Sequence, residues 1–449
     1  MSTIEKHDMT QGKILLPLVS FTIPLVLGNL FQLTYNAADS VIVGKYVGEQ
    51  ALAAVGTSTP IMNIAILLIS GMCMGASVLM SSQYGAKDYD TLSRQISTTM
   101  LAGCGFSVVF SLLMLLLANP VLRLIRVPET AIPEAAAYLR IIFVGLIFTF
   151  MYNFLANTMR ALGDSKTPLY FLVTSAFLNI FGDLFFVVVL RWGVAGSAIA
   201  TVCSEGLCCL LCGIYIKKKI PLLCLGKKWW VFDKSLLGKT VSYGSTSAMQ
   251  QVCLQLGKLI IQSVVNTQGV AVMAAFTAVN RVDDFAYTPQ QNIGHAMTTF
   301  LAQNKGAGHK ERMKKGFQTG LLIELVYSIG LFCVIWGLAP QIMTLFAEDG
   351  DAQVVSLGIS YLHLISWMYI LPGLTNGVQG FFRGIGDLKV TLYSTFMNMF
   401  GRVVAVFVMI RLLQMEFASL AWANMVGWIV MLLFEVPLLV KSMRNGECG

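Results

Sequence analysis

The sequence predicts an all-α membrane protein with about twelve spanning helices. Of the 449 residues, 56% are hydrophobic and only 12% are charged, and the mean hydropathy is +0.71. A soluble domain carries roughly 25% charged residues. The charges lie in short runs between apolar stretches of about 20 residues or more, which is the length a helix needs to cross a hydrocarbon core of about 30 Å.

Charge runs and Gly/Pro punctuation separate the expected spans. The first six are 15–43, 51–80, 95–118, 136–158, 167–190 and 194–216. The second six are 240–264, 270–301, 318–340, 355–380, 390–411 and 417–440. The N-terminal segment MSTIEKHDMTQGK has no basic run before a short apolar core, so we expect the first span to be retained rather than cleaved as a signal peptide.

The positive charges predict the orientation. Of the 31 Lys and Arg residues, 22 lie in connections on one side, six lie on the other side, and three lie inside spans. Since cytoplasmic loops carry the excess of basic residues, we expect both termini to be cytoplasmic in a multi-pass protein of the cell membrane. Lipid and topology thus explain the net charge of +8, and nucleic acid is not an expected partner.

The longest basic connection, KKKIPLLCLGKKWWVFDK at 217–234, lies near mid-chain. It predicts an N-terminal six-helix lobe at 1–216, a cytoplasmic linker at 217–234 and a C-terminal six-helix lobe at 235–449. Its basic residues suit a surface of anionic lipid. The paired Trp229 and Trp230 suit an anchor at the membrane interface.

The two halves are related by an internal repeat. The segment MRALGDSKTPLYFLVTSAFLNIFGD from Met159 resembles FRGIGDLKVTLYSTFMNMFGR from Phe382, with Arg160 and Arg383 offset by 223. A second pair is ASVLMSSQYGAKD from Ala76 and AMTTFLAQNKGAGH from Ala296. Six spans is an even number, so both halves enter from the same side and the repeat is parallel.

Polar residues inside the spans are the candidate functional residues, because charge in hydrocarbon is costly. Asp39 lies deep in the first span, and Asp183 lies in the fifth with Asn179 one turn earlier. Ser197 and Thr201 stand one turn apart in the sixth span, so both pairs share a helix face that can point at Asp39. These oxygens suit Na⁺, and the two acids could instead share a proton. The alternative is that each acid caps a helix or lines a wet crevice.

The repeat indicates an asymmetry between the halves. Asn179-Ile-Phe-Gly182-Asp183 aligns with Asn398-Met-Phe-Gly401-Arg402, so an arginine replaces the acid. Arginine can neither release its proton nor ligate a cation. We therefore expect the ion site in the first half only.

The eighth span carries Arg281, Asp283 and Asp284. Arg281 and Asp284 are three residues apart, so they either form a structural pair or take part in handling substrate or ion. Together with Gln250 of the seventh span, these three are the candidate residues of a substrate cavity. The sequence does not decide the roles of Lys258, Glu205, Glu324 and Glu435.

Several expected motifs of other function classes are absent. The chain has no GxxxxGK[ST] loop and no HExxH motif, so neither ATP hydrolysis nor an enzyme is expected, and no cofactor. The ten cysteines lie mostly in apolar runs, where they pack as small hydrophobic residues. If the protein is a transporter, its energy comes from an ion gradient.

Over essentially the whole chain, the sequence resembles the multidrug and toxic compound extrusion family, in its bacterial DNA-damage-inducible subgroup. The motifs that carry the resemblance are Pro24 and Asp39, RALGDSKTP from Arg160, RGIGD from Arg383, and Arg281 with Phe285, Pro289, Ala296, Phe300 and the run QNKGAG from Gln303.

The resemblance implies two six-helix bundles forming a V around a central cavity, with alternating access powered by H⁺ or Na⁺. It implies that Asp39, Asn179, Asp183 and Thr201 match the family's first-lobe cation or proton site. Pro24 matches the proline near which the first helix bends. A glutamate that another branch uses in the seventh span is missing from SAMQQVCLQLGK, so its second-lobe ion site is not expected here.

The expected function is a secondary antiporter that exports organic cations or amphipathic compounds. Its cavity would use adaptable Met and aromatic side chains, although most of the 23 Met must simply pack. The alternative is a flippase for lipid-linked or cell-wall precursors, for which Lys258, Arg281 and Arg402 could bind phosphate. The lipid bilayer and small molecules are the expected partners, and we expect a monomer.

Overall fold

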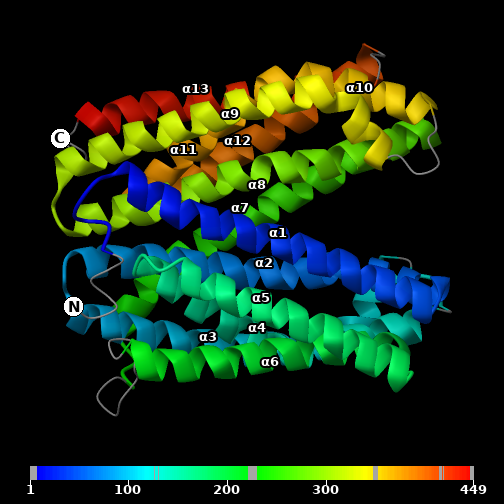
Figure 1. The fold of residues 1–449 in the computed structure, drawn as a ribbon, viewed down its shortest axis with the longest axis horizontal. Coiled ribbons are helices and arrows are strands. Elements are labelled where there is room, and N and C mark those ends of the chain that lie inside the picture. The colour runs from blue at the N-terminus through cyan, green and yellow to red at the C-terminus, as the bar shows by residue number, and fades with distance from the viewer. Residues whose placement is uncertain are drawn as a thin grey trace. The chain divides into compact units, whose positions relative to one another are not determined.

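A computed structural model of the chain describes residues 8–125, 127–129, 131–220, 230–346, 352–413, 417 and 419–444. Within these residues all regular structure is helical, which confirms the all-α expectation (Figure 1). The chain forms two compact units. The first contains Ile23–Ala248, and the second contains Met9–Thr22 and the described residues from Met249 onward.

The helices of the first half follow the expected spans closely. They are α1 (Leu15–Tyr46), α2 (Glu49–Gly85), α3 (Tyr89–Leu124), α4 (Ile132–Ala161), α5 (Lys166–Asp183) continued by a π-helical turn η2 (Leu184–Val189), and α6 (Gly193–Lys219). Within the first unit α4 packs on α2, α3 and α6, while α5 packs on α6. Gly163 and Gly193 adopt positive φ in the connections, a conformation that costs glycine little.

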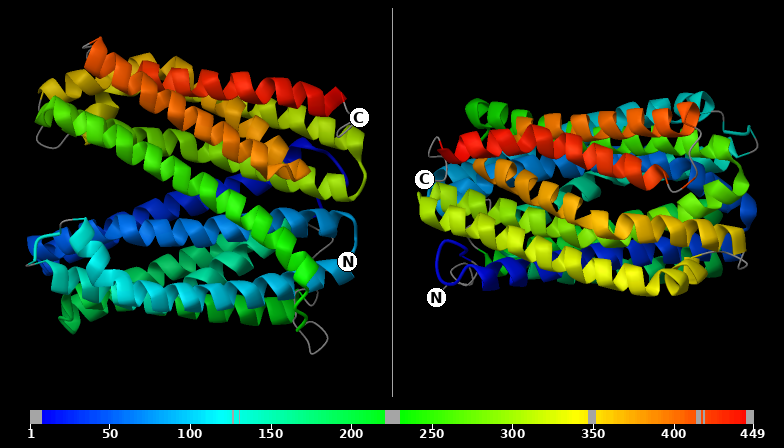
Figure 2. Two further views of the ribbon diagram at one scale, coloured as in Figure 1. Left: turned by 180° about the vertical axis from the view of Figure 1, so that it is seen from behind. Right: turned by 90° about the horizontal axis from the view of Figure 1, so that it is seen from above.

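The helices of the second half repeat this arrangement. They are α7 (Lys234–Val265), η4 (Asn266–Gln268), α8 (Val270–Gly306), α9 (Lys310–Phe346), α10 (Ala352–Ser366), η6 (Trp367–Tyr369), α11 (Ile370–Ile385), α12 (Leu388–Phe407), the π-helical η7 (Val408–Leu412) and α13 (Ser419–Arg444). In the second unit α11 packs on α8 and α9, and α12 packs on α13. Both views of Figure 2 show α12 and α13, in orange and red, side by side.

One expected span, 355–380, is interrupted. A 3₁₀ turn, η6, separates α10 from α11, so the described part of the chain contains thirteen α-helices where about twelve spans are expected. The cause is Pro372, which has no N–H to donate to the carbonyl of Met368 and whose ring crowds that carbonyl. The break leaves the carbonyl of Tyr369 accepting side-chain hydrogen bonds, from Gln290 at 2.8 Å and from Ser328 at 3.3 Å.

By length and composition, ten helical stretches of the described chain are apolar enough to cross a membrane. The helices α7 and α8 fall outside this set although they are 32 and 37 residues long. Arg281, Asp283 and Asp284 make α8 polar, and Ser, Thr and Gln residues do the same for α7. The two helices thus match the expected spans 240–264 and 270–301 in place and length, and differ from the others in composition.

Two apolar cores hold the units, and large apolar side chains also cover their outside. Phe143, Phe150 and Phe154 of α4 are buried in the first unit, and Tyr361 and Tyr369 are buried in the second. Outward-facing residues such as Leu116 (79% exposed) are nevertheless apolar. A soluble protein seldom exposes so much contiguous apolar surface, whereas lipid is a suitable solvent for it.

Helix α2 approaches the start of α7 very closely within the first unit. A Cβ atom built on Gly71 would lie 2.6 Å from the Cα of Ala248, and one on Gly75 would lie 2.5 Å from the carbonyl carbon of Tyr243. Gly71 and Gly75 form a GxxxG pair, which lets helix backbones meet in membranes. Any side chain at Gly75 would force the two backbones apart.

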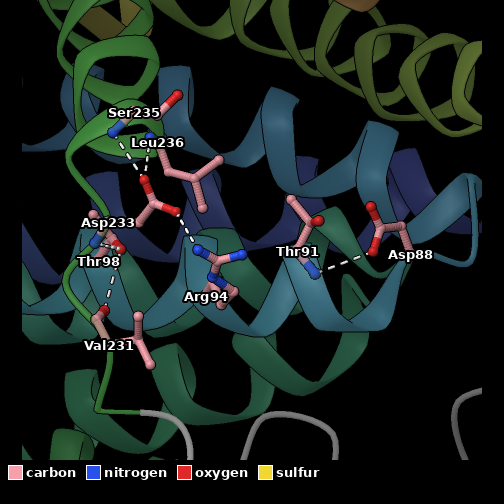
Figure 3. Close-up of polar contacts among 8 residues, drawn as sticks. All are labelled: Asp88, Thr91, Arg94, Thr98, Val231, Asp233, Ser235 and Leu236. Carbon is pink, nitrogen blue, oxygen red and sulfur yellow. Dashed lines mark hydrogen bonds and ion pairs between the residues drawn. The ribbon is translucent and has the colours of Figure 1, made fainter.

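The residue before α7, Asp233, forms hydrogen bonds with α3 (Figure 3). Asp233 accepts a hydrogen bond from Arg94 at 2.6 Å and bonds from the backbone N–H groups of Ser235 (2.8 Å) and Leu236 (3.2 Å). The backbone N–H of Asp233 donates to Thr98 at 3.1 Å. The backbone donors, Leu236 first, and Arg94 lower the pKa of Asp233 below its usual range. Of the expected linker 217–234, residues 221–229, including Trp229, lie outside the described residues.

Candidate functional site

Asp39 and Ser197 meet in the first unit. The hydroxyl of Ser197, one turn into α6, donates a hydrogen bond to Oδ1 of Asp39 on α1 at 2.6 Å. Ser197 is fully buried and Asp39 is half-buried. A short hydrogen bond to an ionised carboxylate is among the stronger ones in proteins. The structure therefore places the sixth-span hydroxyl on the first-span acid.

Asn179 and Thr201 form a second pair beside the first. The amide of Asn179 on α5 donates to Oγ1 of Thr201 at 3.2 Å, and Thr201 donates to the carbonyl of Ser197 at 3.2 Å. Asn179 is 3% exposed, and its Oδ1 has no hydrogen-bond partner in the described part of the chain. This amide oxygen is free to accept a proton donor or a cation.

Asp183 is the most unusual member of the set. It is the last residue of α5, directly before the π-helical turn η2, and it is fully buried. Neither of its carboxylate oxygens accepts a hydrogen bond from a described residue, although Asp39 and Ser197 face it closely enough to interact. A π-helical turn inside an α-helix is frequent at functional sites. Asp39, Asn179, Asp183, Ser197 and Thr201 are called the carboxylate cluster below.

Sequence reasoning left one neighbour of this cluster undecided and missed two others. Glu205 stands one turn beyond Thr201 on α6, and its carboxylate accepts a short hydrogen bond from Thr149 of α4. Tyr35, one turn before Asp39, interacts with Asp39 and Glu205, and Tyr138 interacts with Asp39 and Asp183. The spacing of four residues along α1 and α6 was the signal that could have found Tyr35 and Glu205.

Pro24 lies where α1 passes from one unit to the other. Thr22 belongs to the second unit and Ile23 to the first, and the α-helix is continuous through Pro24. Proline removes the hydrogen bond to the carbonyl of Ser20, so the helix is weakest at this turn. Pro24 thus lies at the boundary in α1 between the residues of the two units.

The charges of the eighth span separate in the structure. Asp283 is buried and accepts hydrogen bonds from Tyr369 (2.6 Å) and Tyr361 (3.3 Å). Asp284 is about half exposed and pairs with Lys258 at 3.2 Å, whereas Arg281 is exposed and has no ion-pair partner among the described residues. Lys258, rather than Arg281, is therefore the partner of Asp284.

Gln250 is buried in a polar network within the second unit. Its amide donates to Gln379 at 3.2 Å and to Thr395 at 3.0 Å, and Thr391 donates to its carbonyl oxygen. Arg383 donates to Gln379 at 2.8 Å, which extends the network. The structure thus gives Gln250 a hydrogen-bonding role between helices.

The repeat places Arg402 differently from the sequence alignment above. The starts of α5 and α12 (Lys166 and Leu388) and of the two π-helical turns (Leu184 and Val408) all keep nearly the offset of 223. At this offset Arg402 is equivalent to Asn179, one turn earlier than Asp183. The alignment of Arg402 with Asp183 was wrong by one helical turn. It followed the local motif NxFG, which begins at Asn179 in one half and at Asn398 in the other, and this pairing is four residues away from the offset of the whole repeat. The position equivalent to Asp183 is the apolar Val406.

Comparisons with known proteins identify the family. The MatE family model matches residues 24–185 and 247–409, one match in each half. The probable multidrug resistance protein YpnP of Bacillus subtilis (strain 168) is 32% identical over 392 residues, which cover 87% of this chain and 86% of the relative. An FAD transporter of Shewanella oneidensis is 21% identical over 400 residues, covering 86% and 87% of the two chains.

A solved structure, described as the outward-facing conformation of a multidrug resistance MATE family transporter of the MOP superfamily, shares the fold. It is 22% identical in sequence to this chain and has a TM-score of 0.91. The match covers 100% of this chain and 99% of the chain in that structure. These relatives are multi-pass membrane transporters, not enzymes. With matches to both halves and a relative above 30% identity, the chain belongs to the MatE family of transporters.

Proposed function

We propose that this protein is a secondary antiporter that exports organic cations or amphipathic compounds in exchange for H⁺ or Na⁺. Transport in this family is ion-coupled, and several relatives are named multidrug resistance or export proteins. The observation that carries the proposal is the carboxylate cluster, in which two acids lie together and neither buried oxygen of Asp183 accepts a hydrogen bond from a described residue.

The chemistry of the cluster suits a monovalent cation. Two carboxylates close together in a region of low dielectric repel one another, so a proton or Na⁺ that neutralises them is favoured. Na⁺ would take oxygen ligands from Asp39, Asn179, Asp183 and Thr201, while Ser197 holds Asp39 in place. A proton would be shared by the two acids.

Ion binding would act on α1 through Asp39. The cluster joins α1, α5 and α6, so neutralising it relieves repulsion between helices that can then pack more closely. Because α1 continues through Pro24 into the second unit, a shift at Asp39 passes along one helix. Ion and cargo compete through these conformations without having to share a binding atom.

The finer assignments are part of the same proposal. We place the chain in the DNA-damage-inducible subgroup, on Pro24, Asp39 and the eighth-span motif, and we expect a monomer. The charge distribution supports lobes at 1–216 and 235–449, a linker at 217–234, and cytoplasmic termini. Exposed Arg281 and the exposed pair Lys258–Asp284 are the candidates for cargo contacts, with Asp283 and Gln250 as buried supports.

A flippase for lipid-linked or cell-wall precursors is the second candidate function. One observation favours it: Arg281 is exposed and has no ion-pair partner in the described residues, so it could bind a phosphate. In that case Arg281→Gln would abolish transport of a phosphate-bearing lipid.

Proteoliposomes with purified protein test the proposed function. Efflux of a fluorescent organic cation is recorded under an imposed pH gradient or an imposed Na⁺ gradient, one at a time. The proposal expects at least one gradient to drive efflux, and expects an ionophore that collapses that gradient to stop it. Efflux that is independent of both gradients would refute antiport.

A further inference from the structure

Glu324 is a buried acid of the second unit that has no hydrogen-bond partner among the described residues. Glu324 lies in the middle of α9 and is 1% exposed. Neither of its carboxylate oxygens makes a hydrogen bond to any described residue, and no Lys, Arg or His among these residues pairs with it. Tyr327 is the ionisable side chain that interacts with it, and the hydroxyl of Tyr327 donates to the carbonyl of Ala286. An isolated carboxylate in such a place costs several kcal/mol or more.

The surroundings of Glu324 are polar and converge from three elements. Gln290 of α8 is fully buried, and its amide nitrogen donates to Ser328 (3.1 Å) and to the carbonyl of Tyr369 (2.8 Å) at the helix break. Ser328, one turn beyond Glu324, donates to the carbonyl of Glu324 at 2.7 Å. These bonds use the nitrogen of Gln290, and no described residue donates a hydrogen bond to its buried Oε1. Three unpartnered oxygens therefore belong to two neighbouring side chains.

Gly373 of α11 leaves space beside this group. A Cβ atom built on Gly373 would lie 2.9 Å from Oγ of Ser328, 3.2 Å from Nε2 of Gln290 and 3.4 Å from Oε2 of Glu324. The three polar atoms thus surround Gly373, one of the glycines of α11. Even a methyl group would enter the space that they face.

The internal repeat shows that the fold does not need an acid here. Gly103 and Glu324 stand equally far from the starts of α3 (Tyr89) and α9 (Lys310), and Phe150 corresponds to Gly373 at the offset of 223. In the first unit a Cβ on Gly103 would lie only 2.0 Å from the ring of Phe150, so an aromatic ring fills the space. Where the first unit has Gly103 and the ring of Phe150, the second unit has the acid Glu324 and Gly373.

We propose that Glu324, Oε1 of Gln290 and the hydroxyl of Ser328 form a second binding site for a monovalent cation, either H⁺ or Na⁺, while the carbonyl of Tyr369 holds Gln290 in place. The site is separate from the carboxylate cluster and does not depend on the proposed function. It changes the expectation that only the first half binds an ion, because that expectation considered Arg402 and the seventh span and left Glu324 undecided. A proton on Glu324, or Na⁺ among these oxygens, neutralises the buried charge.

Cation binding to the full-length protein in detergent tests this proposal. Radioactive Na⁺ bound per chain and the infrared band of protonated carboxyl groups are measured for wild type, Glu324→Gln and the matched control Glu311→Gln. Glu311 lies exposed in the first turn of the same helix. The proposal expects Glu324→Gln, and not the control, to lose either one bound Na⁺ per chain or one protonated carboxyl band. The first loss identifies a Na⁺ site and the second a proton site.

Two further variants separate this site from the cluster and from a folding defect. Asp39→Asn should leave unchanged the bound Na⁺ or the carboxyl band that depends on Glu324. A failure of the proposed antiport function therefore does not decide the proposal of a second cation site. Gly373→Ala keeps the acid and fills the space, and should weaken cation binding or shift the carboxyl band if Glu324→Gln fails to fold. The proposal is wrong if bound Na⁺ and the carboxyl band are both the same in Glu324→Gln as in wild type. If Glu324→Gln is unstable, the proposal is wrong when Gly373→Ala changes neither quantity.

Discussion

Replacing Thr201 by valine should separate Na⁺ coupling from H⁺ coupling. The two side chains have nearly the same shape, so the change removes one hydroxyl and little packing. In the structure this hydroxyl accepts a hydrogen bond from the side-chain amide of Asn179 at 3.2 Å, and Asn179 is 3% exposed. In Thr201→Val the buried amide nitrogen of Asn179 loses this partner, and no described residue donates to the Oδ1 of Asn179 in the wild type.

The expected magnitude follows from the lost ligand, since the unsatisfied amide lowers stability with and without Na⁺. A polar contact to a charged group contributes about 1.5–3 kcal/mol, which corresponds to about 10- to 150-fold in affinity. Na⁺ loses one of its candidate oxygen ligands in Thr201→Val, so its affinity should fall by this amount. A hydroxyl does not titrate, so proton binding by Asp39 and Asp183 should change little.

The assay is initial efflux from proteoliposomes as a function of the driving ion. We expect the half-saturating Na⁺ concentration to rise in Thr201→Val, while the profile against the pH gradient stays that of wild type. Thr174→Val is the matched control, because Thr174 lies exposed on α5 and its hydroxyl donates to the carbonyl of Tyr170 on the same helix. An equal loss of Na⁺-driven and H⁺-driven efflux would refute this reasoning, as would an unchanged Na⁺ dependence in a protein driven by Na⁺.

Three further predictions concern packing, pH and topology. Gly75→Ala should lower the melting temperature in detergent, since overpacking costs about 1–3 kcal/mol, whereas Gly56→Ala, in open space on the same helix, should not lower it. Asp233→Asn should be less stable than wild type at neutral pH. Because the folded-state pKa of Asp233 is lowered, this difference should shrink as the pH falls below the ordinary aspartate value of about 3.9 and through the folded pKa. A single cysteine placed within 217–234, in a cysteine-free background, should resist an impermeant reagent added outside intact cells; labelling there would reverse the proposed orientation.

The fold could be predicted from composition and punctuation because a membrane restricts the choice of structure to long apolar helices. The spans 15–43 to 194–216 each correspond to one helix, and the pairs Asn179–Asp183 and Ser197–Thr201 lie near Asp39. Spacing of four residues defines one helix face, which is why these side chains could be grouped in advance.

Other features depend on contacts between helices, which periodicity does not specify. The break at Trp367–Tyr369 could have been suspected from Pro372, but the π-helical turn after Asp183 has no such marker. Glu324 was left undecided because its significance lies in what surrounds it: a glycine on another helix and an amide on a third. The register of Arg402 was misjudged because a local motif outweighed the offset of the whole repeat.

Gradient-driven efflux by Asp39→Asn is the most direct test of the coupling site. Asparagine keeps the shape and can still accept the hydrogen bond of Ser197, so the variant should fold and insert normally. It cannot release a proton or carry a negative charge. With Asp90→Asn, an exposed acid on α3, as the control, and at equal protein per vesicle, Asp39→Asn should show no efflux above the level without a gradient. Efflux at the wild-type rate would contradict the role of the carboxylate cluster in ion coupling.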